Sequence, residues 1–153
     1  MTIAVHNRQR RVRLDLAWLR NVAQIALAQC AEYPVAPGTA LSGLEHVDVA
    51  IVSDKRIASI HEQFMRISGP TDVITFDHGE IVISAETAQE NARRFSQPLE
   101  HELALYAIHG LLHLNGYDDH KAGEAAKMRR LQESVLKRCL AEVASRLKSA
   151  NKQ

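Results

Sequence analysis

The chain contains little of what marks membrane, secreted or disulfide-bonded proteins. Its 153 residues include no run of roughly 18 apolar residues, so we expect no membrane-spanning helix. Residues 1–7 lack the basic, apolar and cleavage regions of a signal peptide. The two cysteines, Cys30 and Cys139, lie far apart in apolar, helix-like segments. We therefore predict buried free thiols and a cytoplasmic protein, because the cytoplasm keeps thiols reduced.

The chain also has no large excess of charge of one sign. Its formal net charge is +1 at pH 7, which by itself favours no class of partner. The distribution is uneven, because residues 1–20 hold five basic and one acidic residue, and residues 121–153 hold nine and three. Residues 21–120 hold five basic and fourteen acidic residues. Basic ends around an acidic centre fit a nucleic-acid-binding surface, and they equally fit ordinary solvated helix faces.

Length and hydrophobic pattern predict one α+β domain over residues 1–150. A chain of this size with 46% hydrophobic residues can bury one good core. Alternating and β-branched runs predict a small mixed sheet of about four strands, and apolar residues at helical spacing predict helices that cover it. The expected strands are 2–7, 46–51, 71–76 and 80–84, and the expected helices are 14–31, 53–64, 84–94, 98–114 and 125–147, followed by a frayed tail at 148–153.

The segment from His109 to His120 carries the clearest chemical pattern. His109 and His113 are four residues apart in an apolar helical run, so both imidazoles lie on one helix face about one turn apart. The following Asn-Gly pair predicts a helix end, because Gly adopts the left-handed conformation at almost no steric cost. The chain then turns back, and a residue between Tyr117 and His120 can supply a third metal ligand. We predict a metal site on the central helix and the loop after it.

Zinc suits two imidazoles and a carboxylate or a third imidazole. Three protein ligands leave one position open, which is the catalytic arrangement, and the pKa of a bound water can fall to about 7. Metalloproteases with the H-E-x-x-H motif place a glutamate general base directly after the first histidine. Gly110 occupies that position here, which argues against a protease of this kind. A glycine inside a helix costs roughly 1 kcal/mol relative to alanine, so a packing or access reason is expected for it.

The segment 109–119 resembles the signature H-G-x-L-H-L-x-G-Y-D-H of the YbeY family of zinc-dependent single-strand endoribonucleases, and ten of its eleven positions agree. Residues 70–76 (PTDVITF) and 79–83 (GEIVI) are similar to a second family block, P-T-D-V-L-S-F and G-D-I-x-I. The resemblance implies a zinc ion bound by His109 and His113, hydrolysis of single-stranded RNA, and action in 16S rRNA 3′-end maturation and ribosome quality control. The implied partners are rRNA and ribosomal subunits.

The chain departs from the family pattern at two positions. The third zinc-binding histidine of the family corresponds to Asp119, and His120 follows one residue later. We predict Asp119 as the third ligand, because loop geometry fixes the reach, with His120 as the alternative; an oxygen ligand is normal for zinc. The family also carries an arginine five residues before the P-T-D block, where this chain has Met65, next to Arg66. Arg66 is a candidate phosphate-binding residue, and a solvated helix-end charge is the alternative.

Two further functions stay open at this point. The first is a ribosome-associated binding protein whose zinc is structural, and the second is a zinc peptidase that takes its base from elsewhere in the fold.

Overall fold

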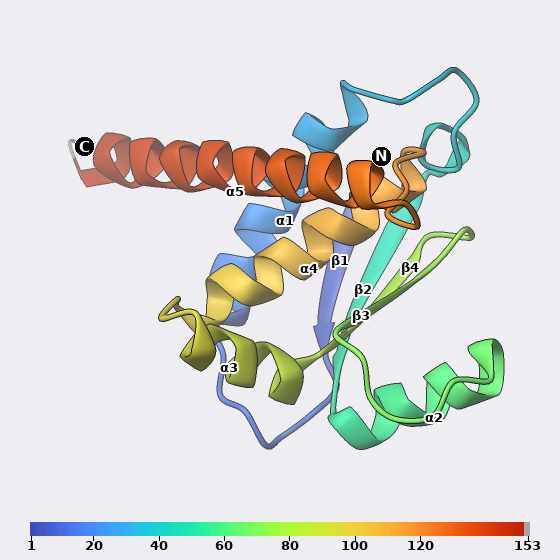
Figure 1. Cartoon of the computed structure of the whole chain (residues 1–153). Coiled ribbons are helices and arrows are strands. Elements are labelled where there is room, and N and C mark those ends of the chain that lie inside the picture. Colours follow the sequence, from blue (N-terminus) through green and yellow to red (C-terminus); the bar gives the residue numbers. More distant parts are fainter. Residues whose placement is uncertain (152–153) are drawn as a thin grey trace.

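A four-stranded mixed sheet with the strand order β1-β2-β4-β3 lies at the centre of the computed structural model, which describes residues 1–151 (Figure 1). Strands β1, β2 and β4 run parallel, and β3 pairs antiparallel with β4 across the tight turn at Gly79. The bounds are β1 (Thr2–Asn7), β2 (His46–Val52), β3 (Val73–Phe76) and β4 (Glu80–Ser84). The prediction of a small mixed sheet in an α+β fold, with a hairpin between its last two strands, is confirmed.

Within residues 1–151, five α-helices follow the order expected from the sequence. Their bounds are α1 (Leu16–Ala31), α2 (Asp54–Met65), α3 (Ala85–Arg94), α4 (Leu99–Leu114) and α5 (Ala122–Asn151), with one 3-10 turn, η1 (Leu41–Gly43). Side chains cap three of the helices, because Asp15, Ser53 and Ser84 each accept a backbone N–H of the first turn.

Three predicted boundaries are wrong by a few residues. Helix α1 begins at Leu16 rather than at residue 14, because the Asp15 carboxylate caps it. Strand β3 begins at Val73 rather than at residue 71, since the Asp72 side chain accepts the Val73 N–H. Helix α5 begins at Ala122 and continues through Asn151, so residues 148–151 are helical rather than frayed. The rest of the predicted tail, 152–153, lies outside the described residues.

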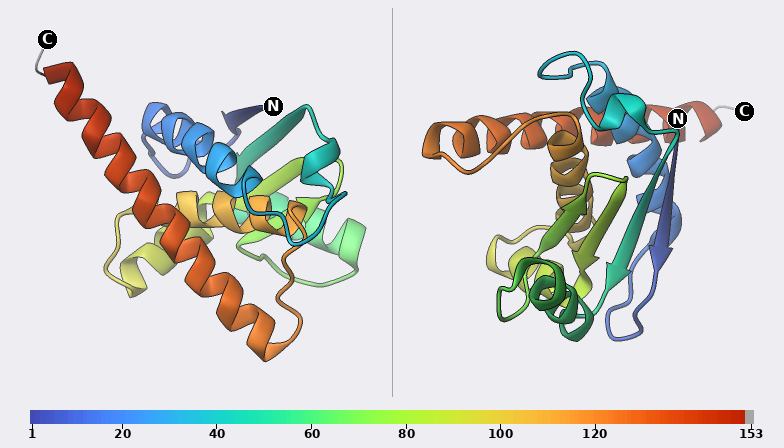
Figure 2. Two further views of the ribbon diagram at one scale, coloured as in Figure 1. Left: turned by 90° about the horizontal axis from the view of Figure 1, so that it is seen from above. Right: turned by 90° about the vertical axis from the view of Figure 1, so that its right-hand side faces the viewer.

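The helices cover the two faces of the sheet unequally. Helices α1 and α4 pack on one face, and α5 lies across both of them on the side away from the sheet (Figure 2). Helix α2 packs on the opposite face through Ile57 and Ile60, against Ala50, Val52 and Val82. Because β2 and β4 are covered on both faces, their inner residues form near-continuous apolar runs.

Close packing against the sheet explains why a glycine, Gly110, occurs inside helix α4. A Cβ built at Gly110 would lie 2.8 Å from Ile81 Cδ1 and Cγ2, and the Ile81 side chain is fully buried on β4. Glycine therefore lets α4 approach the sheet more closely than any other residue would. This close contact fixes the depth at which α4 holds the adjacent His109.

Asn115 fastens the end of α4 to the rest of the protein. The residue is buried; its side-chain amide donates to the Cys30 carbonyl over 2.6 Å, and its Oδ1 accepts the Thr39 hydroxyl over 2.9 Å. Gly116 follows with φ of +97°, which confirms the predicted helix end. The returning loop therefore leaves α4 from a fixed point.

Both cysteines are buried and free, as predicted. Burial raises the pKa of the Cys30 thiol to about 12 and that of Cys139 to about 11, so neither is a reactive thiolate at neutral pH. No helix within residues 1–151 is both long enough and apolar enough to cross a membrane.

Candidate metal centre

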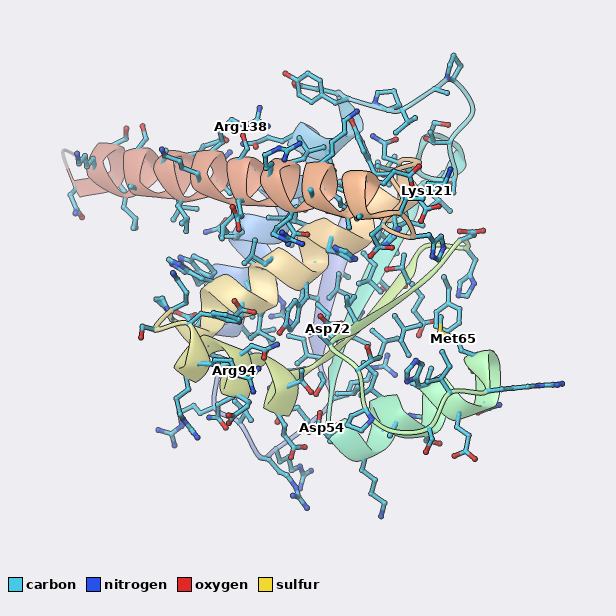
Figure 3. All side chains as sticks on the ribbon, viewed as in Figure 1. Asp54, Met65, Asp72, Arg94, Lys121 and Arg138 are labelled. Carbon is cyan, nitrogen blue, oxygen red and sulfur yellow. The ribbon has the colours of Figure 1, made fainter. Side chains whose placement is uncertain are left out.

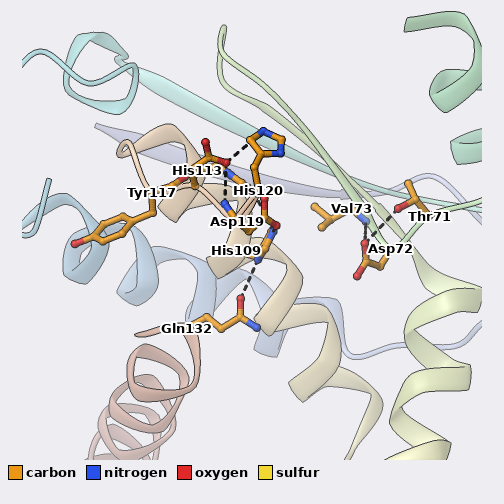
Figure 4. Close-up of polar contacts among 10 residues, drawn as sticks. Thr71, Asp72, Val73, His109, His113, Tyr117, Asp119, His120 and Gln132 are labelled. Atoms are coloured by element: carbon orange, nitrogen blue, oxygen red, sulfur yellow. Dashed lines mark hydrogen bonds and ion pairs between the residues drawn. The ribbon is translucent and has the colours of Figure 1, made fainter. Parts of the chain in front are cut away.

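His109 and His113 present their Nε2 atoms to one another on α4 (Figure 4). The two atoms are 3.0 Å apart, and the ring planes are nearly perpendicular, with centroids 4.6 Å apart. The side chains are 22% and 28% exposed, so both rings are held by the protein but reach solvent. The predicted helical spacing therefore produces a converging pair of imidazoles.

Oxygen acceptors face the other nitrogen of each ring. His113 Nδ1 lies 3.0 Å from the Tyr117 backbone carbonyl, and His109 Nδ1 lies 2.9 Å from Oε1 of Gln132 on α5. Because a carbonyl oxygen only accepts, each Nδ1 carries a hydrogen, and each Nε2 presents a lone pair. Two lone pairs this close repel each other unless a cation or a proton lies between them. This pattern is typical of metal-binding histidines.

Asp119 brings a carboxylate to the same point from the loop after α4. Its Oδ2 lies 3.4 Å from His109 Nε2, and its Oδ1 lies 3.7 Å from His113 Nε2. One ligand atom from each of the three residues lies within 4.8 Å of the others. His120 instead pairs with Asp118 over 3.3 Å, and its side chain is 85% exposed. Asp118, Asp119 and His120 form a second cluster of this kind, but it consists mostly of exposed loop side chains.

The electrostatics keep His113 suited to a metal. Burial lowers the pKa of His113, and the neighbouring His109 lowers it further, while Asp119 acts in the opposite direction. A neutral imidazole keeps the Nε2 lone pair that a metal needs. Two imidazole nitrogen donors and one carboxylate together form a donor set that fits a divalent cation.

A groove of about 450 Å³ opens in front of the three residues. Its other lining residues come from the end of α2, the segment before β3, β3 itself and the loops, namely Met65, Thr71, Asp72, Val73, Ile74, Thr75, Asp77 and His120. Figure 3 labels Met65 at the end of α2 and Asp72 beside α4. No lysine or arginine belongs to this lining in the described part of the chain.

Arg66, the candidate phosphate-binding residue, lies at the C-cap of α2 with φ of +56° and an exposed side chain. It is not among the lining residues of the groove, whereas its neighbour Met65 is. The structure therefore does not bring Arg66 together with the two histidines, and its role stays a prediction.

Helix α5 contributes two residues that the sequence analysis missed. Gln132 and Arg129 line a second, smaller hollow of about 150 Å³ together with His109 and Asp119. Gln132 follows the buried Met128 by four residues, so helical periodicity turns it toward the protein interior. A polar side chain on that apolar face was the pattern that could have identified it.

The fold and the site together define a class of protein, an α+β protein with a solvent-accessible metal-type centre built from two histidines and an aspartate. Comparison with known proteins specifies the family. The family model described as "Endoribonuclease YbeY" matches residues 4–140. The chain therefore belongs to the YbeY family.

Individual relatives agree with this assignment. The chain is 36% identical over 135 residues to Endoribonuclease YbeY of Rhodopirellula baltica, covering 80% of this chain and 69% of that protein. It is 30% identical over 152 residues to Endoribonuclease YbeY of Syntrophus aciditrophicus, covering 88% of each chain. Among solved structures, the solution structure of TM1509 from Thermotoga maritima matches with a TM-score of 0.64 and 28% identity, covering 94% of this chain and 93% of that one.

Proposed function

We propose that the protein is a zinc-dependent endoribonuclease that hydrolyses single-stranded RNA. The observation that carries this proposal is the convergence of His109 Nε2, His113 Nε2 and the Asp119 carboxylate at an open groove in a chain of the YbeY family. Nitrogen and oxygen donors of this kind suit zinc. Three protein ligands rather than four leave a coordination position free, which distinguishes a catalytic site from a structural one.

The residues of the chain divide the work between holding the metal and holding the substrate. His109, His113 and Asp119 would hold the zinc, which when bound polarises a phosphate oxygen and lowers the pKa of a coordinated water. Arg129 borders the hollow that His109 and Asp119 also line, and its guanidinium can bind a phosphate with two parallel hydrogen bonds. The Arg129 side chain is exposed, so its guanidinium can reach a bound substrate.

The charge of α5 supports a nucleic-acid substrate. Exposed basic side chains lie along this helix, namely Lys127, Arg129, Arg130, Lys137 and Arg138. Such charges attract a phosphate backbone without regard to sequence, with an affinity that falls as salt rises. By its resemblance to the family, we assign the protein to 16S rRNA 3′-end maturation and ribosome quality control, with rRNA and ribosomal subunits as partners. A cytoplasmic location belongs to the same proposal, and the free buried thiols support it.

The test is cleavage of a labelled single-stranded RNA before and after chelation. We expect EDTA to abolish cleavage, zinc to restore it, and a duplex of the same sequence to resist it. His113→Ala is expected to lose cleavage, while His120→Ala, which alters the exposed neighbour, retains most of it. Cleavage that is indifferent to chelation would refute the metal mechanism.

The same variants separate this function from the two alternatives. A ribosome-associated protein with structural zinc predicts that His113→Ala unfolds and that the wild type turns over no RNA. A zinc peptidase predicts digestion of casein, and Gly110 stands where the H-E-x-x-H motif would place its general base.

A further inference from the structure

We propose that Gln132 is a positioning residue that holds His109 in the tautomer and orientation required for metal binding. The inference rests on the metal centre of the proposed function but not on activity toward RNA. Gln132 comes from α5, 23 residues after His109, and its Oε1 lies 2.9 Å from His109 Nδ1. Figure 4 shows this contact on the side of the His109 ring opposite His113.

The contact determines which nitrogen of His109 carries the hydrogen. A neutral imidazole has one N–H and one lone pair, and an acceptor at Nδ1 keeps the N–H there. The lone pair then lies on Nε2, which faces His113 Nε2 at 3.0 Å and Asp119 Oδ2 at 3.4 Å. Without the acceptor, the hydrogen can move to Nε2 and the ring can rotate, and either change removes the lone pair from the metal position.

The two histidines are oriented in different ways. His113 uses the Tyr117 backbone carbonyl, which lies in the turn directly after its own helix. His109 depends on a side chain from another helix, so the packing of α5 on α4 enters the geometry of the site. Met128 and Val135, about one turn before and after Gln132, are buried, so this face of α5 points into the protein.

A purely structural role is the alternative explanation for Gln132. The side chain is only half-buried and borders the hollow beside the metal centre, so it fills no part of the core. Residues that orient metal-binding histidines typically change metal affinity by about 10–100-fold when they are replaced. A packing residue would change stability instead.

The test measures zinc affinity and the tautomer of His109 in three variants. Gln132→Leu removes the acceptor, Gln132→Glu keeps an acceptor, and Gln24→Leu makes the same chemical change at an exposed position of α1. Zinc affinity is measured by competition with a chromophoric chelator. The tautomer of the zinc-free protein is measured from the ¹⁵N chemical shifts of the His109 ring, and a thermal melt of each zinc-free variant reports its folding.

We expect Gln132→Leu to bind zinc about 10–100-fold more weakly and to lose the pure Nδ1–H signature of His109. Gln132→Glu is expected to match or exceed the wild-type affinity, and Gln24→Leu to leave it unchanged. Wild-type zinc affinity in Gln132→Leu would overturn the inference, as would equal weakening in Gln132→Glu and Gln132→Leu. Gln132→Ala carries the same expectation if the leucine variant does not fold.

Failure of the wild type to cleave RNA would contradict the proposed function alone, because the affinity and the ring shifts are measured without RNA.

Discussion

Gly110→Ala is expected to destabilise the protein, although alanine is the better helix former. Helix propensity alone would stabilise α4 by about 1 kcal/mol. The new methyl group would lie 2.8 Å from two atoms of the Ile81 side chain, closer than real Cβ contacts approach. Ile81 is fully buried, so it cannot rotate into solvent, and overpacking of this kind costs typically about 1–3 kcal/mol. The sum predicts a loss of stability between about 0 and 2 kcal/mol.

The assay is the free energy of unfolding from urea titration, with Gly123→Ala as the matched control. Gly123 also lies in a helix, and a Cβ there would meet nothing within 4 Å. That variant is expected to be neutral or to gain up to about 1 kcal/mol. An equal gain in Gly110→Ala would refute the packing explanation.

A double variant connects the effect to Ile81. Ile81→Val alone typically costs about 0.5–1.5 kcal/mol, because it leaves a small cavity. Combined with Gly110→Ala, it relieves part of the overlap. The double variant should therefore lose less free energy of unfolding than the sum of the losses in the two single variants. Strict additivity would show that the alanine methyl group and Ile81 do not interact.

Three further predictions concern the cap of α4, a buried acid and the third ligand. Asn115→Ala is expected to cost about 1–3 kcal/mol in urea unfolding, because it leaves the buried Cys30 carbonyl and the half-buried Thr39 hydroxyl without their hydrogen-bond partner. Burial raises the pKa of Glu102, so the folded state favours the neutral carboxylic acid. Below the pKa of the unfolded chain the side chain is neutral in both states and the stability of the protein is unaffected. As pH rises, burial of the charged form lowers the free energy of unfolding. Glu102→Gln should therefore raise Tm at pH 7, and the gain should vanish below about pH 4; an equal gain at all pH values would contradict it. Zinc should raise the Tm of the wild type and of His120→Ala, but not that of Asp119→Ala. At a zinc concentration of 100 times Kd, the stabilisation is equivalent to about 2.7 kcal/mol. The reverse pattern in the two variants would make His120 the third ligand.

The central helix and its two histidines were predictable because their pattern is local. A spacing of four residues fixes the shared face of His109 and His113 in any helix, and the Asn-Gly pair fixes where that helix ends. Alternation and β-branched runs also predicted the strands of a small mixed sheet, so the sheet was predictable in outline. The strand order β1-β2-β4-β3 depends on pairing between distant segments and could not be read from these local patterns.

Contacts between distant segments could not be predicted in this way. Gln132 contacts His109 only because α5 packs across α4, and the sequence periodicity of neither helix predicts where the two helices cross. The role of Asn115 depends on where α1 ends, since its amide binds the carbonyl of Cys30. The preference for Asp119 over His120 likewise depends on the path of a short loop, which places adjacent side chains in different environments.

The charge around the metal centre bears on which arginine holds the substrate phosphate. Asp72, Asp77 and Asp119 line the main groove, where no lysine or arginine of the described residues contributes, and Met65 occupies the position of the family arginine. Carboxylates in such a groove repel a phosphate, so the positive charge must come from the bound metal ion or from the smaller hollow that His109 and Asp119 also line. Arg129 lines that hollow, one turn before Gln132 on the same face of α5. Gln132, which we propose orients His109, and Arg129, which we propose binds the phosphate, therefore both come from α5. The centre thus depends on two helices, because α4 supplies the two histidines and α5 supplies these supporting side chains.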